Sequence, residues 1–233
     1  MNPTLATTLS GLLVFLLSYL CGSLPSGYII GRLNGIDIRK YGSHNIGATN
    51  VRRVLGRDWS FICFLLDFLK GYLPVVFIGH RFGGTLAVEA AMGGIIAAIG
   101  TIMGHVFPVW LHFKGGKGVA TSLGALAGIA LLPVLIGGLV WLAVFELRRI
   151  VSLASMAAVV AIAVSALVLR LLNIYMVSWP GIILLVIVAA LVIIRHHENI
   201  ARLRDGTEKP FPSPKEQTKE SPSDKIDTID KKK

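Results

Sequence analysis

Residues 119–145 decide the fold, and they read VATSLGALAGIALLPVLIGGLVWLAVF without a single charged residue. A soluble domain needs polar surface positions at regular spacing, and this stretch offers almost none. Hydrophobic residues make up 54% of the 233 residues and charged residues 15%, against roughly 25% charged residues in soluble domains. The sequence therefore predicts an all-α integral membrane protein.

Three further apolar segments precede this stretch. The first span is expected at about 9–32, with a kink or break near Pro25. A cleaved signal peptide would carry a Lys or Arg before its apolar run, and none is present here, so we expect this span to be retained. The second and third spans are expected at about 59–79 and 86–111. The 32–57 loop carries six basic residues and the 80–85 link carries one, so the positive-inside rule predicts an external N-terminus.

The way residues 119–145 cross the membrane sets the number of spans, because spans at about 152–171 and 178–194 follow. A single crossing would put Arg148, Arg149 and the basic C-terminus outside. Two short or tilted helices, turning near Pro133 and Gly137-Gly138, would put them in the cytoplasm. Each half has only about 13 residues, against ~17–25 for a full span. We predict two helices, seven spans in all and a cytoplasmic C-terminus.

The chain divides into a membrane domain, residues 1–204, and a polar tail, residues 205–233. The tail is rich in Lys, Asp, Glu, Ser and Pro without apolar periodicity, which predicts disorder in the cytoplasm. The net charge of +10 follows the loops and this tail. The chain has no basic helix interleaved with aromatic residues, so the pattern disfavours a nucleic-acid-binding protein.

Three basic patches rich in Gly, Asn or His lie at the ends of predicted spans. They read Tyr41-Gly-Ser-His-Asn-Ile-Gly-Ala-Thr-Asn50, Phe113-Lys-Gly-Gly-Lys-Gly-Val-Ala-Thr121 and Arg195-His-His-Glu-Asn-Ile-Ala-Arg-Leu203. In the predicted topology all three, together with Arg148-Arg-Ile-Val-Ser152, face the cytoplasm. Backbone N–H groups, hydroxyls, amides and cations are the groups that a phosphate ester needs. We therefore expect one phosphate-binding site at the membrane surface.

The glycine–lysine patch gives the strongest local signal. Its glycines allow a close approach to an anion, the helix that begins at Val119 adds a favourable dipole, and Lys114 and Lys117 add charge. Gly118 follows Lys117 where a Walker A loop has Ser or Thr, so an ATPase is disfavoured. The alternative is a tight turn whose lysines merely obey the positive-inside rule.

The other polar residues leave more alternatives open. The hydroxyls and amides of the first patch suit either ligand binding or a well-capped loop, and His44 suits a solvent-facing residue. His196 and Asn199 share a face if the last helix continues, as ligand groups or as interfacial residues. Asp67 and Lys70, three residues apart within a span, are expected to pair. No His, Asp or Glu group has metal-ligand spacing, so no metal or cofactor is expected.

The order and spacing of these motifs resemble the PlsY family, the bacterial acyl-phosphate-dependent glycerol-3-phosphate acyltransferases. The resemblance covers about residues 8–205 and rests on the three patches together with Val151-Ser-Leu153. The family usually has Gly-Ser-Gly-Asn-Pro-Gly-Ala-Thr-Asn in the first patch; here His44 replaces a glycine and Ile46 a proline. Family membership implies a seven-spanning enzyme of the bacterial inner membrane with its site facing the cytoplasm. It implies transfer of an acyl group from acyl phosphate to the 1-hydroxyl of glycerol 3-phosphate, next to membrane lipid, giving lysophosphatidic acid and phosphate.

The resemblance also assigns roles to the motif residues. His196, Ser43 and Asn45 are the expected catalytic residues. The expected phosphate-binding residues are Lys114, Gly115, Gly116, Lys117, Gly118, Arg53, Arg149, Ser152, Asn199, Thr49 and Asn50. The chain lacks a Gly-x-Ser-x-Gly elbow and a His-x-x-x-x-Asp signature, which favours direct transfer without an acyl-enzyme. From local chemistry alone, a transporter of a phosphorylated metabolite remains the alternative.

Overall fold

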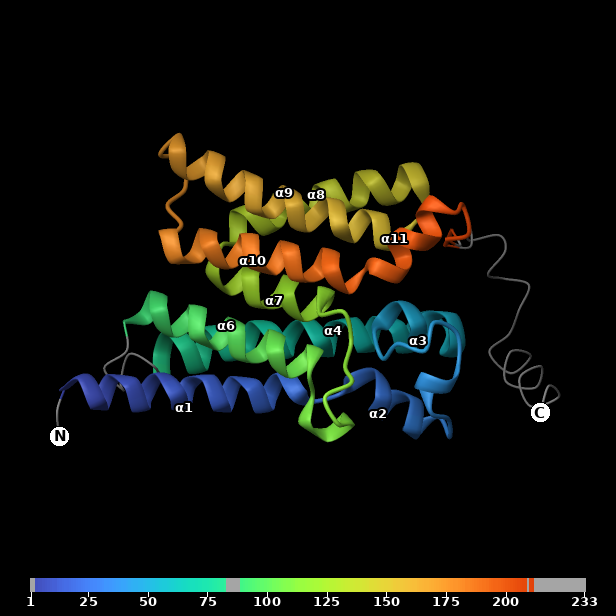
Figure 1. Cartoon of the computed structure of the whole chain (residues 1–233), viewed down its shortest axis with the longest axis horizontal. Helices are drawn as coiled ribbons and strands as arrows, with labels where there is room; N and C mark the ends of the chain where they lie inside the picture. Colours follow the sequence, from blue (N-terminus) through green and yellow to red (C-terminus); the bar gives the residue numbers. More distant parts are fainter. Residues whose placement is uncertain (1–2, 83–88, 209, 212–233) are drawn as a thin grey trace.

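The computed structural model describes residues 3–82, 89–208 and 210–211, and this part of the chain is helical without strands. Figure 1 shows the longer helices side by side along one axis. They are α1 (Pro3–Ser23), α4 (Arg57–Leu73), α6 (Ala90–Val106), α7 (Val119–Ile129), α8 (Leu131–Arg148), α9 (Val151–Leu171) and α10 (Trp179–Arg195). The shorter elements are α2 (Ser26–Leu33), η1 (Ile38–Lys40), α3 (Ala48–Leu55), η2 (Pro74–Phe82), η3 (Val109–Leu111) and α11 (His197–Arg204).

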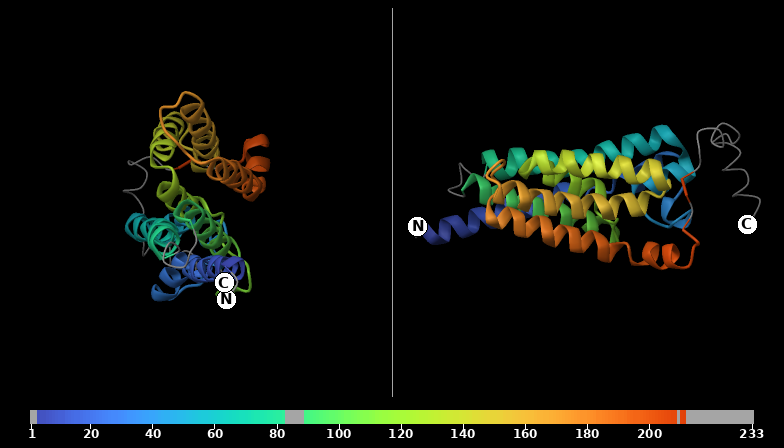
Figure 2. Two further views of the ribbon diagram at one scale, coloured as in Figure 1. Left: turned by 90° about the vertical axis from the view of Figure 1, so that its left-hand side faces the viewer. Right: turned by 90° about the horizontal axis from the view of Figure 1, so that it is seen from above.

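The short helices α2, α3 and α11 gather at one end of the bundle, which we call the loop end, and α1 begins at the opposite end (Figures 1 and 2). Five helical segments are long and apolar enough to cross a membrane: 4–33, 57–81, 90–111, 131–148 and 151–171. The bent pair α10–α11, with an angle of 58°, makes a sixth candidate. The structure therefore has five or six candidate spans in its described residues, and α7 is a shorter apolar helix beside them.

The first span breaks where the sequence predicts. Helix α1 ends at Ser23 and α2 begins at Ser26, with Pro25 as its N-cap residue. The side chain of Lys70 reaches this break, and its Nζ donates a hydrogen bond of 2.6 Å to the carbonyl of Leu24. A cation at a helix C-terminus is favourable because it faces the negative end of the helix dipole.

The turn within residues 119–145 lies at Ala130, and the prediction of a turn near Pro133 and Gly137-Gly138 was wrong. Ala130 has φ −145° and ψ 72°, which ends α7 and starts α8. Helix α8 has 18 residues rather than a short half, and the two helices run in opposite directions (Figure 1). Pro133 lies in the first turn of α8, where its missing N–H leaves no helical bond unmade.

Close glycine contacts hold α7 against α4. A Cβ added to Gly71 would lie 3.0 Å from the backbone N of Ala125, and one added to Gly124 would lie 2.9 Å from the carbonyl carbon of Phe68. Small residues let two backbones approach, which is how membrane helices pack tightly. The main apolar core spans α1, η2 and α6 to α10, and a smaller core lies under α2, η1 and α3 at the loop end.

Candidate active site

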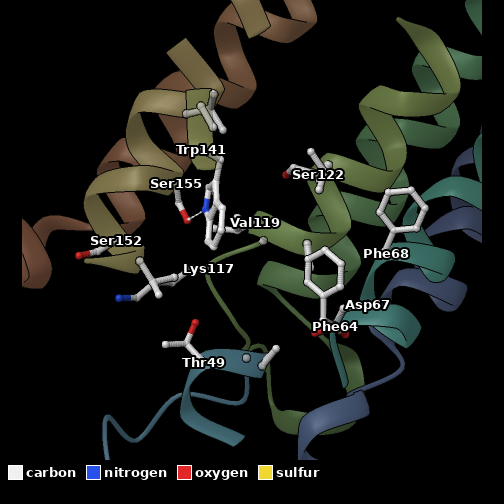
Figure 3. Close-up of a pocket in the computed structure, with 18 of the residues that line it drawn as sticks. Thr49, Phe64, Asp67, Phe68, Lys117, Val119, Ser122, Trp141, Ser152 and Ser155 are labelled. Carbon is white, nitrogen blue, oxygen red and sulfur yellow. Dashed lines mark hydrogen bonds between the residues drawn. The ribbon is translucent and has the colours of Figure 1, made fainter. Parts of the chain in front are cut away.

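A cavity of about 930 Å³ opens between α3, α4 and α7 on one side and α8, α9 and α11 on the other. This volume is near the upper end of the ~300–1,000 Å³ of small-molecule sites. Figure 3 shows Thr49, Lys117 and Ser152 at its polar end, each from a different part of the chain. The polar end is lined by Ser43, Asn45, Thr49, Asn50, Arg52, Arg53, Lys117, Ser152, His196, Asn199 and Glu208.

Asn50 organises the first loop. Its Oδ1 accepts a 2.7 Å hydrogen bond from the backbone N–H of Ser43. Its Nδ2 donates to three carbonyls, those of Ile38, Tyr41 and Asn45. Asn50 is 1% exposed and each polar atom of its amide has a protein partner, so its amide holds Ser43 and Asn45 in place at the cavity.

The structure accommodates both departures from the family pattern in this loop. His44 has φ +57°, the left-handed conformation in which glycine is preferred, and its exposed ring donates from Nδ1 to the carbonyl of Arg39 at 3.0 Å. Ile46 is 3% exposed and packs in the small core with Val51 and Cys63. His44 is therefore exposed to solvent, and Ile46 fixes the loop by packing into the small core.

The glycine–lysine loop lies on the end of α6. The backbone N–H of Gly115 donates to the carbonyl of Val106, and that of Gly116 donates to the carbonyl of His105, each at 3.2 Å. Arg195 donates from Nη2 to the carbonyl of Gly116 at 3.1 Å. These N–H groups are therefore used inside the protein, while the next two residues, Lys117 and Gly118, line the cavity.

His196 and Asn199 both lie at the junction of α10 and α11, and both are buried. The Nδ1 of His196 lies 2.7 Å from the carbonyl of Val192. A carbonyl only accepts, so Nδ1 carries the proton and, in the neutral ring, Nε2 is left as an acceptor. The side-chain carbonyl of Asn199 accepts from the ammonium of Lys117. The second and third motifs are thus joined side chain to side chain.

Glu208 belongs to the segment assigned to the tail, yet its side chain lies inside the site. It accepts hydrogen bonds from Ser152 Oγ at 2.7 Å, Asn199 Nδ2 at 2.5 Å and Arg202 Nε at 2.6 Å. Nearby, Phe211 lies against Arg52, whose guanidinium carbon is 4.4 Å from the ring centre. Neither Glu208 nor Phe211 was predicted from the sequence, because the surrounding composition is that of a disordered segment. The disorder prediction itself concerns mainly residues 209 and 212–233, which lie outside the described part of the chain.

Burial and charge shift the pKa values at the polar end. Burial lowers the pKa of Arg53, and burial together with the charge of Arg202 lowers the pKa of Lys117. Burial, followed by the charge of Lys117, lowers the pKa of His196 below its ordinary value. Burial raises the pKa of Glu208, but hydrogen bonds from Arg202, Asn199 and Ser152 outweigh it and the net shift is downward. Such a site favours an anion beside its cations and a neutral imidazole.

A buried ionic network supports the inner wall. Asp67 Oδ1 lies 2.7 Å from Lys70 Nζ, so the predicted pairing is confirmed. His105 is 3% exposed, and its Nδ1 lies 3.0 Å from Thr121 Oγ1 and 3.7 Å from Asp67 Oδ1. Asp67 and His105 line the cavity, and Figure 3 shows Asp67 beside Phe64. The network therefore links α4, α6 and α7 directly behind the site.

The rest of the cavity is apolar. Phe64 and Phe68 from α4 and Leu123 and Leu126 from α7 form one wall, and α8 and α9 form the other. Trp141 of α8 donates from Nε1 to Ser155 Oγ at 3.3 Å (Figure 3). The cavity thus joins a cationic, hydroxyl-rich end to a long apolar arm.

The structure brings most of the predicted site residues together. Ser43, Asn45, Thr49, Asn50, Arg53, Lys117, Gly118, Ser152, His196 and Asn199 all line the cavity. Four others lie outside its lining: Lys114, Gly115, Gly116 and Arg149. Arg149 instead pairs with Glu146 at 3.1 Å and lies over the Phe145 ring. The spacing of residues in the sequence does not tell which side of a loop faces inward.

This geometry defines an integral membrane protein whose cavity joins a cationic end to an apolar arm. The sequence model of the family described as glycerol-3-phosphate acyltransferase matches residues 12–206. The curated glycerol-3-phosphate acyltransferase of Aquifex aeolicus is 38% identical over 205 residues, covering 87% of this chain and 100% of that protein. That of Mesorhizobium japonicum is 43% identical over 199 residues, covering 84% and 94%.

Solved structures agree. The crystal structure of PlsY (YgiH), an integral membrane glycerol 3-phosphate acyltransferase, in its glycerol 3-phosphate form has a TM-score of 0.77 and 37% identity. It covers 87% of this chain and 96% of that chain. The lysophosphatidic acid form gives a TM-score of 0.75. The chain therefore belongs to the glycerol-3-phosphate acyltransferase family.

Proposed function

We propose that the protein transfers an acyl group from acyl phosphate to the 1-hydroxyl of glycerol 3-phosphate. The products are 1-acyl-glycerol 3-phosphate, which is lysophosphatidic acid, and inorganic phosphate. The observation that carries the proposal is the two-part cavity. Its cationic end suits the phosphates of both substrates, and its apolar arm suits the acyl chain. The relatives named as glycerol-3-phosphate acyltransferases support glycerol 3-phosphate as the acceptor of the acyl group.

The polar end divides into an anion site and a reaction site. We assign the substrate phosphates to Lys117, Gly118, Arg53, Ser152 and Asn199, with Thr49 at the rim. Asn50 at the cavity wall holds the first loop through its own hydrogen bonds. Outside the lining, the other loops are held by Lys114, Gly115, Gly116 and Arg149, since their described contacts are within the protein. Ser43 and Asn45 are placed to donate hydrogen bonds to the oxygen of the reacting carbonyl.

The reaction is a direct displacement. The 1-hydroxyl oxygen attacks the carbonyl carbon, the bond from that carbon to the phosphate oxygen breaks, and phosphate leaves with its bonding electrons. The hydroxyl proton goes to Nε2 of His196 or to an oxygen of the leaving phosphate. The neutral imidazole suits the first route, because Nδ1 is already bonded to Val192. Acyl phosphate is activated, so positioning and charge stabilisation supply much of the acceleration.

We also propose seven membrane spans, with the N-terminus outside and the C-terminus and site in the cytoplasm of a bacterial inner membrane. The antiparallel pair α7–α8 supports the count, because α7 starts and α8 ends at the loop end. The six basic residues of 32–57 support the orientation. Labelling of single cysteines in intact cells tests it: a cysteine at Ser178 reacts with an impermeant reagent, and one at Arg204 does not. The reverse pattern would refute the orientation.

A purified assay tests the reaction. Radiolabelled glycerol 3-phosphate is mixed with acyl phosphate, acyl-CoA or acyl carrier protein as separate donors. We expect lysophosphatidic acid from acyl phosphate alone. Binding of glycerol 3-phosphate without product from any donor would instead favour a transporter. The polar lining comes largely from α3, α11 and the loop before α7. Helices α3 and α11 lie at one end of the bundle rather than midway, which disfavours a transporter (Figure 1).

A further inference from the structure

One face of α8 forms a wall of the apolar arm. Val134, Gly138, Trp141 and Phe145 recur at the three- and four-residue spacing of one helix face, and all four line the cavity. Trp141 and Phe145 stack on each other with ring centres 4.9 Å apart. Toward the other end of α8 the wall continues through Leu135 and Leu131. Along this wall Gly138 is a position without a side chain.

The two adjacent glycines of α8 have different surroundings. A Cβ on Gly137 would lie 2.9 Å from Ile162 Cδ1 and 3.0 Å from the carbonyl of Ala158, so Gly137 is required for packing against α9. A Cβ on Gly138 would meet no atom within 4 Å, and no positive φ is found there. Neither packing nor backbone conformation therefore requires glycine at 138, although glycine is less favourable in a helix than alanine. What it leaves is open space in the cavity.

The position of this open space along the cavity matters for the length of the apolar chain that can bind. Going along α8 away from the loop end, the lining meets Phe145, then Trp141, then Gly138. A ligand whose phosphate sits beside Lys117 and Ser152 would therefore pass the two aromatic rings before it reaches Gly138. Gly138 lies two helical turns, about 10 Å, beyond Phe145. The cavity continues about as far again to Leu131. A short apolar chain ends before Gly138, and a long one must pass it.

We propose that Gly138 is a specificity-determining residue that lets long acyl chains occupy the inner half of the apolar arm. This inference rests on the proposed acyl transfer. A larger side chain at 138 would project into the arm rather than into the protein, so it shortens the space without disturbing the helix contacts. The polar end should stay unchanged, because it lies beyond Phe145, about 10 Å along α8 from Gly138.

The test compares Gly138→Leu with Ala143→Leu, which adds bulk to an exposed position of α8 outside the cavity lining. Decanoyl phosphate and palmitoyl phosphate serve as donors. We expect Gly138→Leu to lower the ratio of kcat/KM for palmitoyl over decanoyl phosphate by at least about tenfold, the scale of losing one or two methylene contacts. The KM for glycerol 3-phosphate should not change. Gly138→Ala should give a smaller shift in the same direction, and Ala143→Leu none.

A second measurement keeps the inference testable without turnover. Palmitoyl and decanoyl lysophosphatidic acid are added to each protein, and the rise in Tm is recorded. Wild type should be stabilised more by the palmitoyl lipid, and Gly138→Leu should lose that difference while its ligand-free Tm stays near wild type. Unchanged chain preference in Gly138→Leu, in either measurement, would overturn the inference. If the wild-type protein turns over neither donor but its Tm still rises more with the palmitoyl lipid, and Gly138→Leu loses that difference, the proposed reaction is refuted and the inference about Gly138 stands.

Discussion

Removing Lys70 should destabilise the protein far more than its single charge suggests. The ammonium lies 2.7 Å from Asp67 Oδ1 and 2.6 Å from the carbonyl of Leu24, and the two charged side chains are 6% and 3% exposed. In Lys70→Met the Asp67 carboxylate keeps only Cys63 Sγ at 3.8 Å and His105 Nδ1 at 3.7 Å as described polar neighbours. A buried carboxylate without its cation then faces an apolar interior.

The size of the effect follows from this geometry. Breaking a buried ion pair by removing one partner costs about 3–5 kcal/mol. At 1.4 kcal/mol for each factor of ten, the folded-to-unfolded ratio falls roughly 10²- to 10⁴-fold. The double variant Asp67→Asn/Lys70→Met removes both charges, so no unpaired carboxylate stays buried. The second substitution should therefore recover part of the stability that the first one loses.

Reversible unfolding in mixed micelles, followed by tryptophan fluorescence, measures these differences. Lys40→Met is the matched control, because it makes the same change at an exposed position, and it should stay within about 0.5 kcal/mol of wild type. The reasoning fails if Lys70→Met behaves like Lys40→Met. It also fails if the double variant is less stable than Lys70→Met by the full cost of Asp67→Asn alone.

Three predictions concern turnover. Gly116→Ala puts a Cβ 3.0 Å from His105 Cε1 and closer to Nε2. By displacing the loop it should lower kcat/KM about 10²-fold. Adding His105→Ala should relieve part of that loss, because it removes the clashing ring. His196→Gln should lower kcat about 10²- to 10⁴-fold. Because the lowered pKa keeps His196 neutral, wild-type activity should fall only below about pH 6.5, and the variant's pH–rate profile should lack this limb. Lys117→Met should raise the KM for glycerol 3-phosphate at least about tenfold more than Lys114→Met, because only Lys117 lines the cavity; equal effects would contradict the assignment.

The helical membrane fold could be predicted from composition, because apolar runs of this length have few alternatives. The break at Pro25 was also visible, since proline ends a helix by removing a donor. The turn at Ala130 was not. Gly137 and Pro133 looked like turn residues, but glycine also serves close helix contacts and proline also suits a first helical turn. The residue type alone does not show whether a glycine or proline forms a turn or lies within a helix, because that depends on the helix packed against it.

The convergence of the motif loops was predicted from topology and is confirmed by the cavity lining. What the sequence hid was the direction of each side chain. Arg149 lies at the end of a predicted span, as the other predicted cations do. Its side chain nevertheless lies against Phe145, outside the cavity lining. Glu208 follows the third motif within a polar, charged segment that also holds Asp205, and nothing in that segment indicated the contacts with Ser152 and Asn199.

The shortness of α7 sets the depth at which the site lies. Eleven residues span about 16 Å, less than the ~30 Å hydrocarbon layer, so the loop before Val119 can lie just below the membrane surface while surrounded by protein. At that depth a lipid's head group meets its chain. An acyl chain held in the apolar arm then never has to enter water, a step that costs about 0.8 kcal/mol per methylene. For a long chain the free energy of moving it into water exceeds the whole stability of many domains. The short α7 therefore allows the reaction to take place while the acyl chain stays in the membrane.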